Sequence, residues 1–246
     1  MDGIDWKAFA EIFDDFNSEQ YNPILPLFCH WAVDRLDGRD SEPGRFLDVG
    51  CGTGLVVEAF VDWYPEASFL LVDSQPEMLA SAHGRLGRDP RIRIEASRAE
   101  PFLATLEPAS LDVVLFARSF YALADHDRVA SDAVRALRPD GLVLLLDFTG
   151  PIDLDPLDEM FGRIEPDRWP LCRRVYEDFN HGLVTGRYRT FTAEEMADLW
   201  RAAGGKLRDY QSNRPASGTH FAAIGRAPDG PGDSAAPRHR SLDCRP

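Results

Sequence analysis

The residues with the clearest capacity for chemistry lie in one short run, Phe46 to Val56, which reads FLDVGCGTGLV. An apolar strand pattern there contains an acid, Asp48, and is followed by three alternating glycines and then by a helical pattern. Glycines at such a turn remove side chains where the backbone bends, so a ligand can lie against main-chain amides at the start of the next helix. A tight turn without any ligand would use the same glycines, and a lone glycine triplet favours that simpler interpretation.

A second acid changes this balance. Asp73 ends the next apolar strand pattern, about 20 residues beyond the turn, where a carboxylate can accept hydrogen bonds from both hydroxyls of a ribose. A dinucleotide site would need the spacing GxGxxG, and Leu55 stands where its third glycine belongs. The sequence also contains no GxxxxGK[ST] run, which excludes a Walker site. The two features together predict a nucleoside ligand with an unphosphorylated ribose.

The elements that must position these residues alternate regularly between strand and helix patterns. Five strands are predicted at 45–49, 68–72, 91–95, 111–116 and 142–147. Helices are predicted between them near 55–63, 76–86, 100–106 and 127–137. A last helix at 193–203 leads to two closing strands, at 206–212 and 220–225. This order predicts an α/β fold with a doubly wound, Rossmann-like, seven-stranded sheet covered on both faces.

Three further segments flank this core. Aromatic residues at helical spacing from Trp6 to Phe16, and a second amphipathic pattern after Pro23, predict two N-terminal capping helices within residues 1–40. Within the main domain, residues 41–226, the stretch at about 150–190 is too rich in Trp, Tyr and Phe to be a free linker and is predicted to be a lid. Residues 227–246 are dominated by breakers and are predicted to be a disordered tail.

Composition narrows the classes of partner. The 246 residues carry 27 Lys and Arg against 41 Asp and Glu, a formal net charge of -14, which disfavours nucleic acid and anionic membrane surfaces. The four cysteines form no CxxC pair, so no zinc site or other metal site is predicted, and a reducing cytoplasm is expected. Neither a secretory leader nor a membrane-spanning run is recognisable. A small-molecule substrate is the expected partner, and a homodimer is left open.

On these residues the chain resembles the class I S-adenosylmethionine (SAM)-dependent methyltransferases of the small-molecule kind. The similarity runs from about Phe46 to Phe148 and includes the LDVGCGTG turn, the VDSQPEML segment at 72–79 and the RALRPDG turn at 135–141. The resemblance implies SAM as the cofactor. It also implies that Asp48 holds the ammonium group, that Gly50, Cys51 and Gly52 pass along the methionyl and ribose parts, and that Asp73 takes the ribose hydroxyls.

The same resemblance implies the remaining cofactor contacts. Ser74 and Met78 would lie beside the adenine, and Ser97, Arg98 and Ala99 would contact its edge, although relatives often have Asp where Ser97 stands. Phe116 and Ala117 would border the sulfonium, and Tyr21 would close over the cofactor. The full set expected to bind the cofactor is Asp48, Gly50, Cys51, Gly52, Gly54, Asp73, Ser74, Met78, Ser97, Arg98, Ala99, Phe116, Ala117 and Tyr21.

Catalytic residues are harder to predict, because methyl transfer from a sulfonium is an in-line displacement that mainly needs alignment and exclusion of water. His181 is the best candidate for a general base, although the pattern favours the simpler interpretation of a solvent-exposed loop histidine. Tyr121 is expected to orient the acceptor or to pack in the lid. Arg118, and with it Arg173 and Arg174, could pair with an acceptor carboxylate. Aromatic residues of the lid, Trp169, Tyr176 and Tyr188, could shape the acceptor pocket.

The leading prediction is therefore a SAM-dependent methyltransferase acting on a small molecule. An alternative keeps SAM but does non-methyl chemistry, such as cyclisation of the aminobutyryl chain with release of methylthioadenosine, because nearby side chains decide which carbon is attacked. A non-catalytic partner that retains the nucleoside site is a third hypothesis. An oxidoreductase is the least favoured, because the glycine spacing is wrong.

Overall fold

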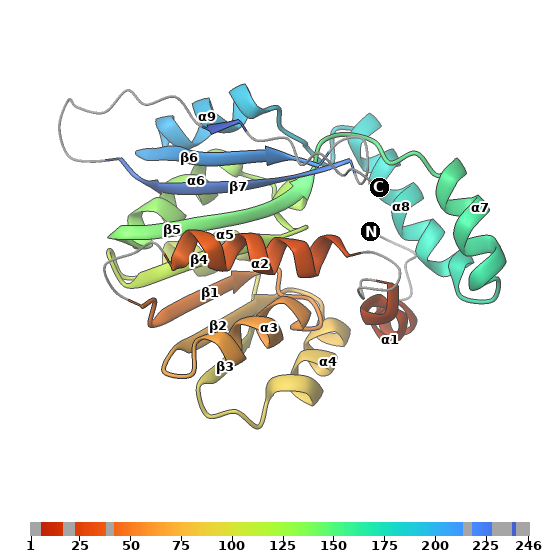
Figure 1. Ribbon diagram of the computed structural model, residues 1–246, viewed down its shortest axis with the longest axis horizontal. Helices are drawn as coiled ribbons and strands as arrows, with labels where there is room; N and C mark the ends of the chain where they lie inside the picture. The colour runs from red at the N-terminus through yellow and green to blue at the C-terminus, as the bar shows by residue number, and fades with distance from the viewer. Residues whose placement is uncertain (1–5, 17–22, 38–41, 214–217, 228–237, 240–246) are drawn as a thin grey trace.

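One sheet runs through the middle of the molecule, with helices on both of its faces (Figure 1). The computed structural model describes residues 6–16, 23–37, 42–213, 218–227 and 238–239. Within these residues the strand order is β3-β2-β1-β4-β5-β7-β6-β8. The strands are β1 (Arg45–Val49), β2 (Ser68–Asp73), β3 (Ile92–Ala96), β4 (Leu111–Ala117), β5 (Leu137–Phe148), β6 (Gly205–Ser212), β7 (Thr219–Arg226) and β8 (Arg238–His239).

The strand directions follow from how the strands are connected. Strands β1 to β5 are parallel, since each is joined to the next through a helix on one face of the sheet. Strand β7 is antiparallel to both of its neighbours, β5 and β6, because only residues 213–218 separate it from β6, too few for the crossover that a parallel strand needs. The sheet is therefore mixed. The predicted α/β, doubly wound, Rossmann-like fold is confirmed, with all seven predicted strands present.

Alternation along the strands divides the core into two layers. Phe46 on β1 faces a cluster formed with α2 (Ile24–Leu36), α3 (Leu55–Trp63) and α4 (Pro76–Leu86). The neighbouring Leu47 faces the opposite cluster, formed with α5 (Ala99–Ala104), α6 (His126–Ala136) and α9 (Ala193–Ala202). Successive side chains of a strand point to opposite faces, so short apolar strands can serve both layers at once. This double burial fixes the strands in register and leaves their carboxyl ends to build a site.

A third group of helices lies beyond one end of the sheet (Figure 1). These are α1 (Trp6–Phe16), α7 (Asp155–Ile164) and α8 (Trp169–Val184), with a short 3-10 turn, η1 (Phe120–Ala122), nearby. Phe16 of α1, Phe161 of α7 and Trp169 of α8 pack together in one buried cluster. The segment predicted as a lid thus folds into two helices that pack on the first helix of the chain.

Two larger differences separate the structure from the sequence prediction, beside shifts of one or two residues at other ends of elements. Strand β5 begins at Leu137, earlier than the predicted residue 142, because Leu137 already pairs with Leu111 of β4. The register then shifts, and regular pairing resumes where Leu142 meets Val113. The predicted disordered tail falls almost entirely outside the described residues. Of that tail, Arg238 and His239 form β8, which pairs in parallel with β6 and adds a strand that the sequence did not predict. None of the described helices has the length and apolar character needed to span a bilayer.

Candidate functional site

A pocket of about 660 Å³ opens at the carboxyl ends of the central strands. Its floor comes from the residues that follow β1, β2 and β4, and its cover comes from α1 and α8. In the strand order, the chain turns from one half of the sheet to the other between β1 and β4. Ligands of open α/β sheets bind at such a switch point, because the loops on its two sides diverge and leave a crevice.

The glycine turn forms one wall of this pocket. Gly50, Gly52 and Gly54 have φ angles of 73°, 55° and 80°, in the left-handed region that favours glycine. A Cβ atom on Gly50 would lie 2.5 Å from the Cβ of Ser119, whereas a Cβ on Gly52 would meet no atom within 4 Å. The backbone NH groups of Gly50 and Cys51 donate to Val72 O at 2.7 and 3.1 Å. The turn is thus held to β2, and Gly52 faces open space in the pocket.

Asp73, at the end of β2, is fixed beside this turn. Its Oδ2 accepts a hydrogen bond from the Gly52 NH at 2.9 Å, and its Oδ1 accepts one from the Gln75 NH at 2.8 Å. Burial raises the pKa of Asp73, and these backbone donors oppose that rise by stabilising the charged form. Each carboxylate oxygen can accept more than one hydrogen bond, so both can still receive a ligand hydroxyl. The geometry suits a ribose.

Asp48 carries the most informative orphaned atom. The side chain is buried, it lines the pocket, and its Oδ1 has no hydrogen-bond partner among the described residues. Burial, with a smaller contribution from the charge of Asp73, raises the pKa of Asp48 to about 7. A buried carboxylate oxygen without a donor is costly, and native proteins almost always satisfy such atoms. The atom therefore fits a cationic ligand group such as the ammonium of SAM.

The far end of the pocket floor combines short polar and apolar groups. Ser74, Met78, Ser97, Arg98 and Ala99 all line it. The Ser97 NH donates to Asp73 O at 3.0 Å, which ties the end of β3 to the end of β2. The Arg98 guanidinium lies 3.7 Å from a carboxylate oxygen of Glu100 and is largely exposed. This end combines apolar lining with a few polar groups, as sites for small ligands such as an adenine do.

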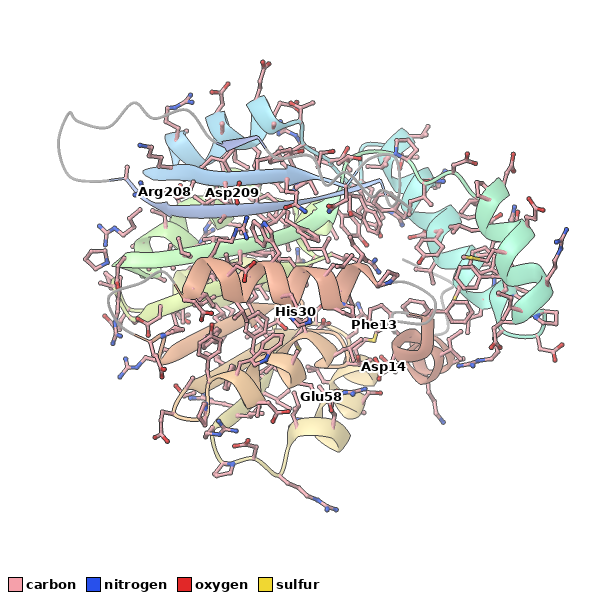
Figure 2. All side chains as sticks on the ribbon, viewed as in Figure 1. Phe13, Asp14, His30, Glu58, Arg208 and Asp209 are labelled. Atoms are coloured by element: carbon pink, nitrogen blue, oxygen red, sulfur yellow. The ribbon has the colours of Figure 1, made fainter. Side chains whose placement is uncertain are left out.

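Helix α1 covers the pocket with Phe9, Phe13 and Phe16. It is held down by Asp14, which accepts a hydrogen bond from the Thr53 hydroxyl at 2.5 Å and forms an ion pair with Arg85 of α4. Figure 2 shows Phe13 and Asp14 together on α1, on the side of the molecule that carries α3 and α4. Because Thr53 belongs to the glycine turn, this contact couples the cover directly to the floor of the pocket. Tyr21, the predicted cover residue, lies outside the described residues.

The opposite end of the pocket is lined by Arg118 and a group of aromatic rings. Arg118 has a φ of 57°, a conformation that costs a non-glycine residue about 1 to 2 kcal/mol, and its NH donates to Leu146 O at 2.7 Å. The guanidinium carbon lies 5.6 Å from the centre of the Phe148 ring. Tyr121 meets Phe148 and Tyr188 edge to face. Burial lowers the pKa of Arg118 and raises that of Tyr121.

The structure brings most of the predicted site residues to this one pocket. Those that line it are Asp48, Gly50, Cys51, Gly52, Asp73, Ser74, Met78, Ser97, Arg98, Ala99, Ala117, Arg118 and Tyr121. Gly54 and Phe116 do not line it: a Cβ on Gly54 would point at Leu86 of α4, and Phe116 is buried in the cluster on the other face of the sheet.

His181 is the predicted residue whose placement argues most directly against its expected role. It lies near the end of α8, its side chain is exposed, and it is not among the residues that line the pocket. The face of α8 that reaches the pocket presents Cys172, Val175 and Tyr176, and His181 falls off that helical stripe. Trp169 also faces elsewhere, stacking on Phe161 of α7.

Other lining residues were missed by the sequence analysis. Glu100 accepts a hydrogen bond from the Ala124 NH at 3.0 Å and thereby ties α5 to the loop after β4. Phe148 ends β5. Because ligands of such sheets bind at the carboxyl ends of the strands, the reasoning that selected Asp73 could also have found Phe148. Cys172 and Asp178 lie on α8, and nothing in their local sequence marks them. Among the described residues, no three His, Cys, Asp or Glu side chains are grouped so that they could hold a metal ion.

Comparisons with known proteins point to one family. A family described as "Methyltransferase domain" matches residues 46–141. A malonyl-[acyl-carrier protein] O-methyltransferase from Laribacter hongkongensis is 31% identical over 206 residues, which cover 80% of this chain and 68% of that protein. A trans-aconitate 2-methyltransferase from Methylobacterium nodulans is 36% identical over 138 residues, covering 56% of this chain and 47% of that protein.

The likeness in structure is broader than the likeness in sequence. A SAM-dependent methyltransferase from Thermotoga maritima superposes with a TM-score of 0.56 at 16% identity, covering 90% of this chain and 99% of the other. At that identity the likeness shows the fold alone. The chain spans less than half the length of two of the curated relatives that it matches, 37% and 47%.

Proposed function

Since this chain belongs to the class I SAM-dependent methyltransferases, we propose that it transfers the methyl group of SAM to an oxygen atom of a small molecule. SAM is the methyl donor of this family, and it supplies a methyl group already activated by a positively charged sulfur. The chain's own residues then have three tasks: to bind the donor, to align the acceptor oxygen behind the methyl carbon, and to exclude water.

The observation that carries the proposal is the pairing of two acids across one glycine turn. The orphaned Oδ1 of Asp48 would receive the ammonium of SAM, and Asp73 would receive the ribose hydroxyls. Gly52, whose missing side chain leaves open space in the pocket, would let the cofactor lie against the backbone between them. One elongated ligand would thus contact all three: Asp48 through its ammonium, Asp73 through its ribose hydroxyls, and the backbone at Gly52 between them.

A small acceptor is favoured by the size and cover of the pocket. Its volume of about 660 Å³ lies in the range of small-molecule sites, and aromatic residues of α1 and α8 cover it. The net charge of -14 would repel the phosphate backbone of a nucleic acid. Oxygen as the attacked atom is supported by the name of the relative from Laribacter hongkongensis, an O-methyltransferase.

The alternative of a cyclising enzyme that releases methylthioadenosine has no support. The relatives reported above are all named methyltransferases, and no feature of the pocket favours attack within the cofactor. A cytoplasmic location is part of the proposal. It is supported by Cys29, Cys51 and Cys172, which are buried free thiols among the described residues, as expected in a reducing compartment.

Calorimetry with SAM and with its demethylated product, S-adenosylhomocysteine, tests the cofactor half of this proposal. Both ligands should bind the purified chain, and Asp73→Ala should weaken both, because the variant removes the ribose acceptor and the carboxylate that holds the Gly52 NH. Arg174→Gln, on the exposed face of α8 and outside the pocket lining, serves as the matched control and should bind normally. Failure of the wild-type chain to bind either ligand would contradict the proposal.

A further inference from the structure

We propose that the acceptor is a carboxylic acid whose ionised carboxylate is received by Arg118 and attacks the methyl group directly. The inference rests on the proposed function and adds the substrate class of the same site. Two independent observations carry it: the place of one arginine in the pocket, and the chemistry of the other groups around it.

The structure separates Arg118 from the two other candidate arginines. Arg173 points away from the pocket toward Asp158, with an N–O distance of 2.8 Å, and Arg174 is exposed. Neither lines the pocket, whereas Arg118 does, directly after the end of β4. Its backbone is held in a strained left-handed conformation, which the native fold tolerates only where surrounding structure enforces it, and such strain gathers at functional sites.

The surroundings of Arg118 suit a planar anion. The guanidinium lies over the Phe148 ring. Burial lowers the pKa of Arg118, and the nearby side chains of Tyr176, Tyr121 and Asp147 oppose that shift. Asp147 accepts backbone hydrogen bonds from the Tyr121 NH at 2.7 Å and the Phe148 NH at 2.9 Å. A guanidinium donates two parallel hydrogen bonds to carboxylates, and such a bond is stronger in a site with little water.

The second observation concerns proton removal. Among the described residues that line the pocket there is no histidine. Burial raises the pKa values of Tyr121 and Tyr176, and that of Tyr188 to about 12, so these hydroxyls stay protonated. Asp178 accepts a hydrogen bond from the Tyr188 hydroxyl at 3.2 Å and pairs with Arg187, and a carboxylate is in any case a weak base toward an alcohol. An alcohol or phenol acceptor would find no evident base here, whereas a carboxylic acid is already ionised at neutral pH.

The same charges weigh against the other acceptor classes. A protonated amine would have to lose a proton before attack and would meet the positive charge of Arg118. A phosphate monoester carries nearly two charges at neutral pH, and the acceptor end offers one guanidinium. A monocarboxylate with an apolar or aromatic body matches both the single cation and the aromatic walls.

The step needs no further reagent. One carboxylate oxygen accepts hydrogen bonds from Arg118, and the other attacks the methyl carbon in line with the bond to sulfur. The new bond is carbon to oxygen, the bond that breaks is carbon to sulfur, and its electron pair stays on sulfur. The products are a methyl ester and the neutral thioether S-adenosylhomocysteine, and no proton moves.

Binding of benzoate and benzamide to the protein saturated with S-adenosylhomocysteine tests the recognition. The two probes share size and ring and differ in charge, so wild type should bind benzoate about tenfold more tightly. Arg118→Gln should abolish this preference, and Arg118→Lys should keep part of it, since it retains the charge but loses the planar fork. Arg174→Gln should leave the preference unchanged. Equal binding of the two probes by wild type, no binding of benzoate at millimolar concentration, or a preference that survives in Arg118→Gln would overturn the inference.

Product chemistry provides the second readout. Wild type is incubated with methyl-labelled SAM and a metabolite extract, and the labelled products are treated with alkali. Methyl esters release the label as methanol, whereas methyl ethers and methylamines retain it. Alkali-labile label that falls sharply in Arg118→Gln supports the inference, and alkali-stable label overturns it. Calorimetry in the same samples keeps the two claims apart: lost SAM binding defeats the proposed function, whereas intact SAM binding with alkali-stable label defeats the carboxylate alone.

Discussion

The two ends of the pocket are built from different materials. At the proposed cofactor end, the glycine turn and Asp73 lie within one continuous unit of β1, the turn, α3 and β2, and the backbone itself forms much of the wall. At the acceptor end, Arg118, Phe148 and Tyr176 come from separate segments, and side chains form the wall. A backbone wall tolerates almost no substitution, whereas a side-chain wall can be rebuilt residue by residue. The difference explains how one fold can keep one donor and accept many substrates.

The largest expected effect is at the backbone wall. Gly52→Val places a side chain in the space left open for the cofactor, and such overfilling should weaken SAM binding about 100-fold or more. No atom of the protein lies within 4 Å of the added Cβ, so the cost to folding should be limited to the backbone strain at a φ of 55°. Calorimetry with SAM and thermal unfolding measure the two effects. Normal SAM binding by Gly52→Val would show that the cofactor does not use this wall.

The next effect is electrostatic and depends on pH. Asp48 has a pKa of about 7 in the free protein, and an ammonium beside it would favour the ionised form. SAM binding should therefore release a proton below pH 7, and affinity should fall up to about tenfold for each pH unit below that value. Asp48→Asn should bind SAM about 20-fold more weakly near pH 7 and should lose this pH dependence. Calorimetry between about pH 5.5 and 7 measures both quantities. A wild-type affinity that does not change with pH would contradict this role for Asp48.

A smaller effect is expected where the cover meets the floor. Asp14→Asn removes the ion pair to Arg85 and weakens the bond to the Thr53 hydroxyl, so α1 should open more often. We expect about a fivefold loss of SAM affinity, mainly through faster dissociation. Glu58→Gln is the matched control, because Glu58 pairs with the same arginine from the exposed side and leaves the contact between Asp14 and Thr53 intact. Stopped-flow dissociation rates that are equal in the two variants would show that α1 is not held by Asp14.

The smallest effect on binding is expected at His220, which lies outside both ends of the pocket. The ring is fully buried, neither nitrogen has a hydrogen-bond partner among the described residues, and burial lowers its pKa to about 4. The unfolded chain binds this proton at about pH 6.5, so stability should fall as pH drops from 6.5 toward 4, by about 3 kcal/mol in total.

His220→Phe should remove this part of the acid sensitivity and leave SAM affinity unchanged. Asp48 and Asp147, whose pKa values are raised to about 7, change stability in the opposite direction over this pH range. The comparison must therefore be made between the variant and wild type at each pH, by denaturant unfolding. An equal pH dependence in the two proteins would show that burial does not lower the pKa of His220.

The unequal predictability of the two ends has a physical cause. Asp48, the glycines and Asp73 could be found from the sequence because two neighbouring strands, with the turn and the helix between them, fix their relative positions locally. The strands themselves were predictable because burial on both faces leaves short apolar runs bounded by breakers. The antiparallel direction of β7 follows from its direct connection to β6, and only its pairing with β5 required the structure.

The acceptor end could not be predicted in the same way. Whether Arg173 or Arg174 faces the pocket depends on how α8 packs on α1 and on the rotation of that helix, which its sequence does not determine. His181 shows the same difficulty: its chemistry suits a base, but the helical stripe of α8 that reaches the pocket does not include it. Residue type thus suggested candidates at this end, and tertiary packing selected among them.

The most direct test of the central claim is a crystal structure of the chain with S-adenosylhomocysteine bound. We expect the ribose hydroxyls within hydrogen-bond distance of Asp73, the amino group at Oδ1 of Asp48, and the sulfur facing the end of the pocket that holds Arg118. A ligand bound elsewhere, or one that leaves Asp48 and Asp73 untouched, would contradict the account.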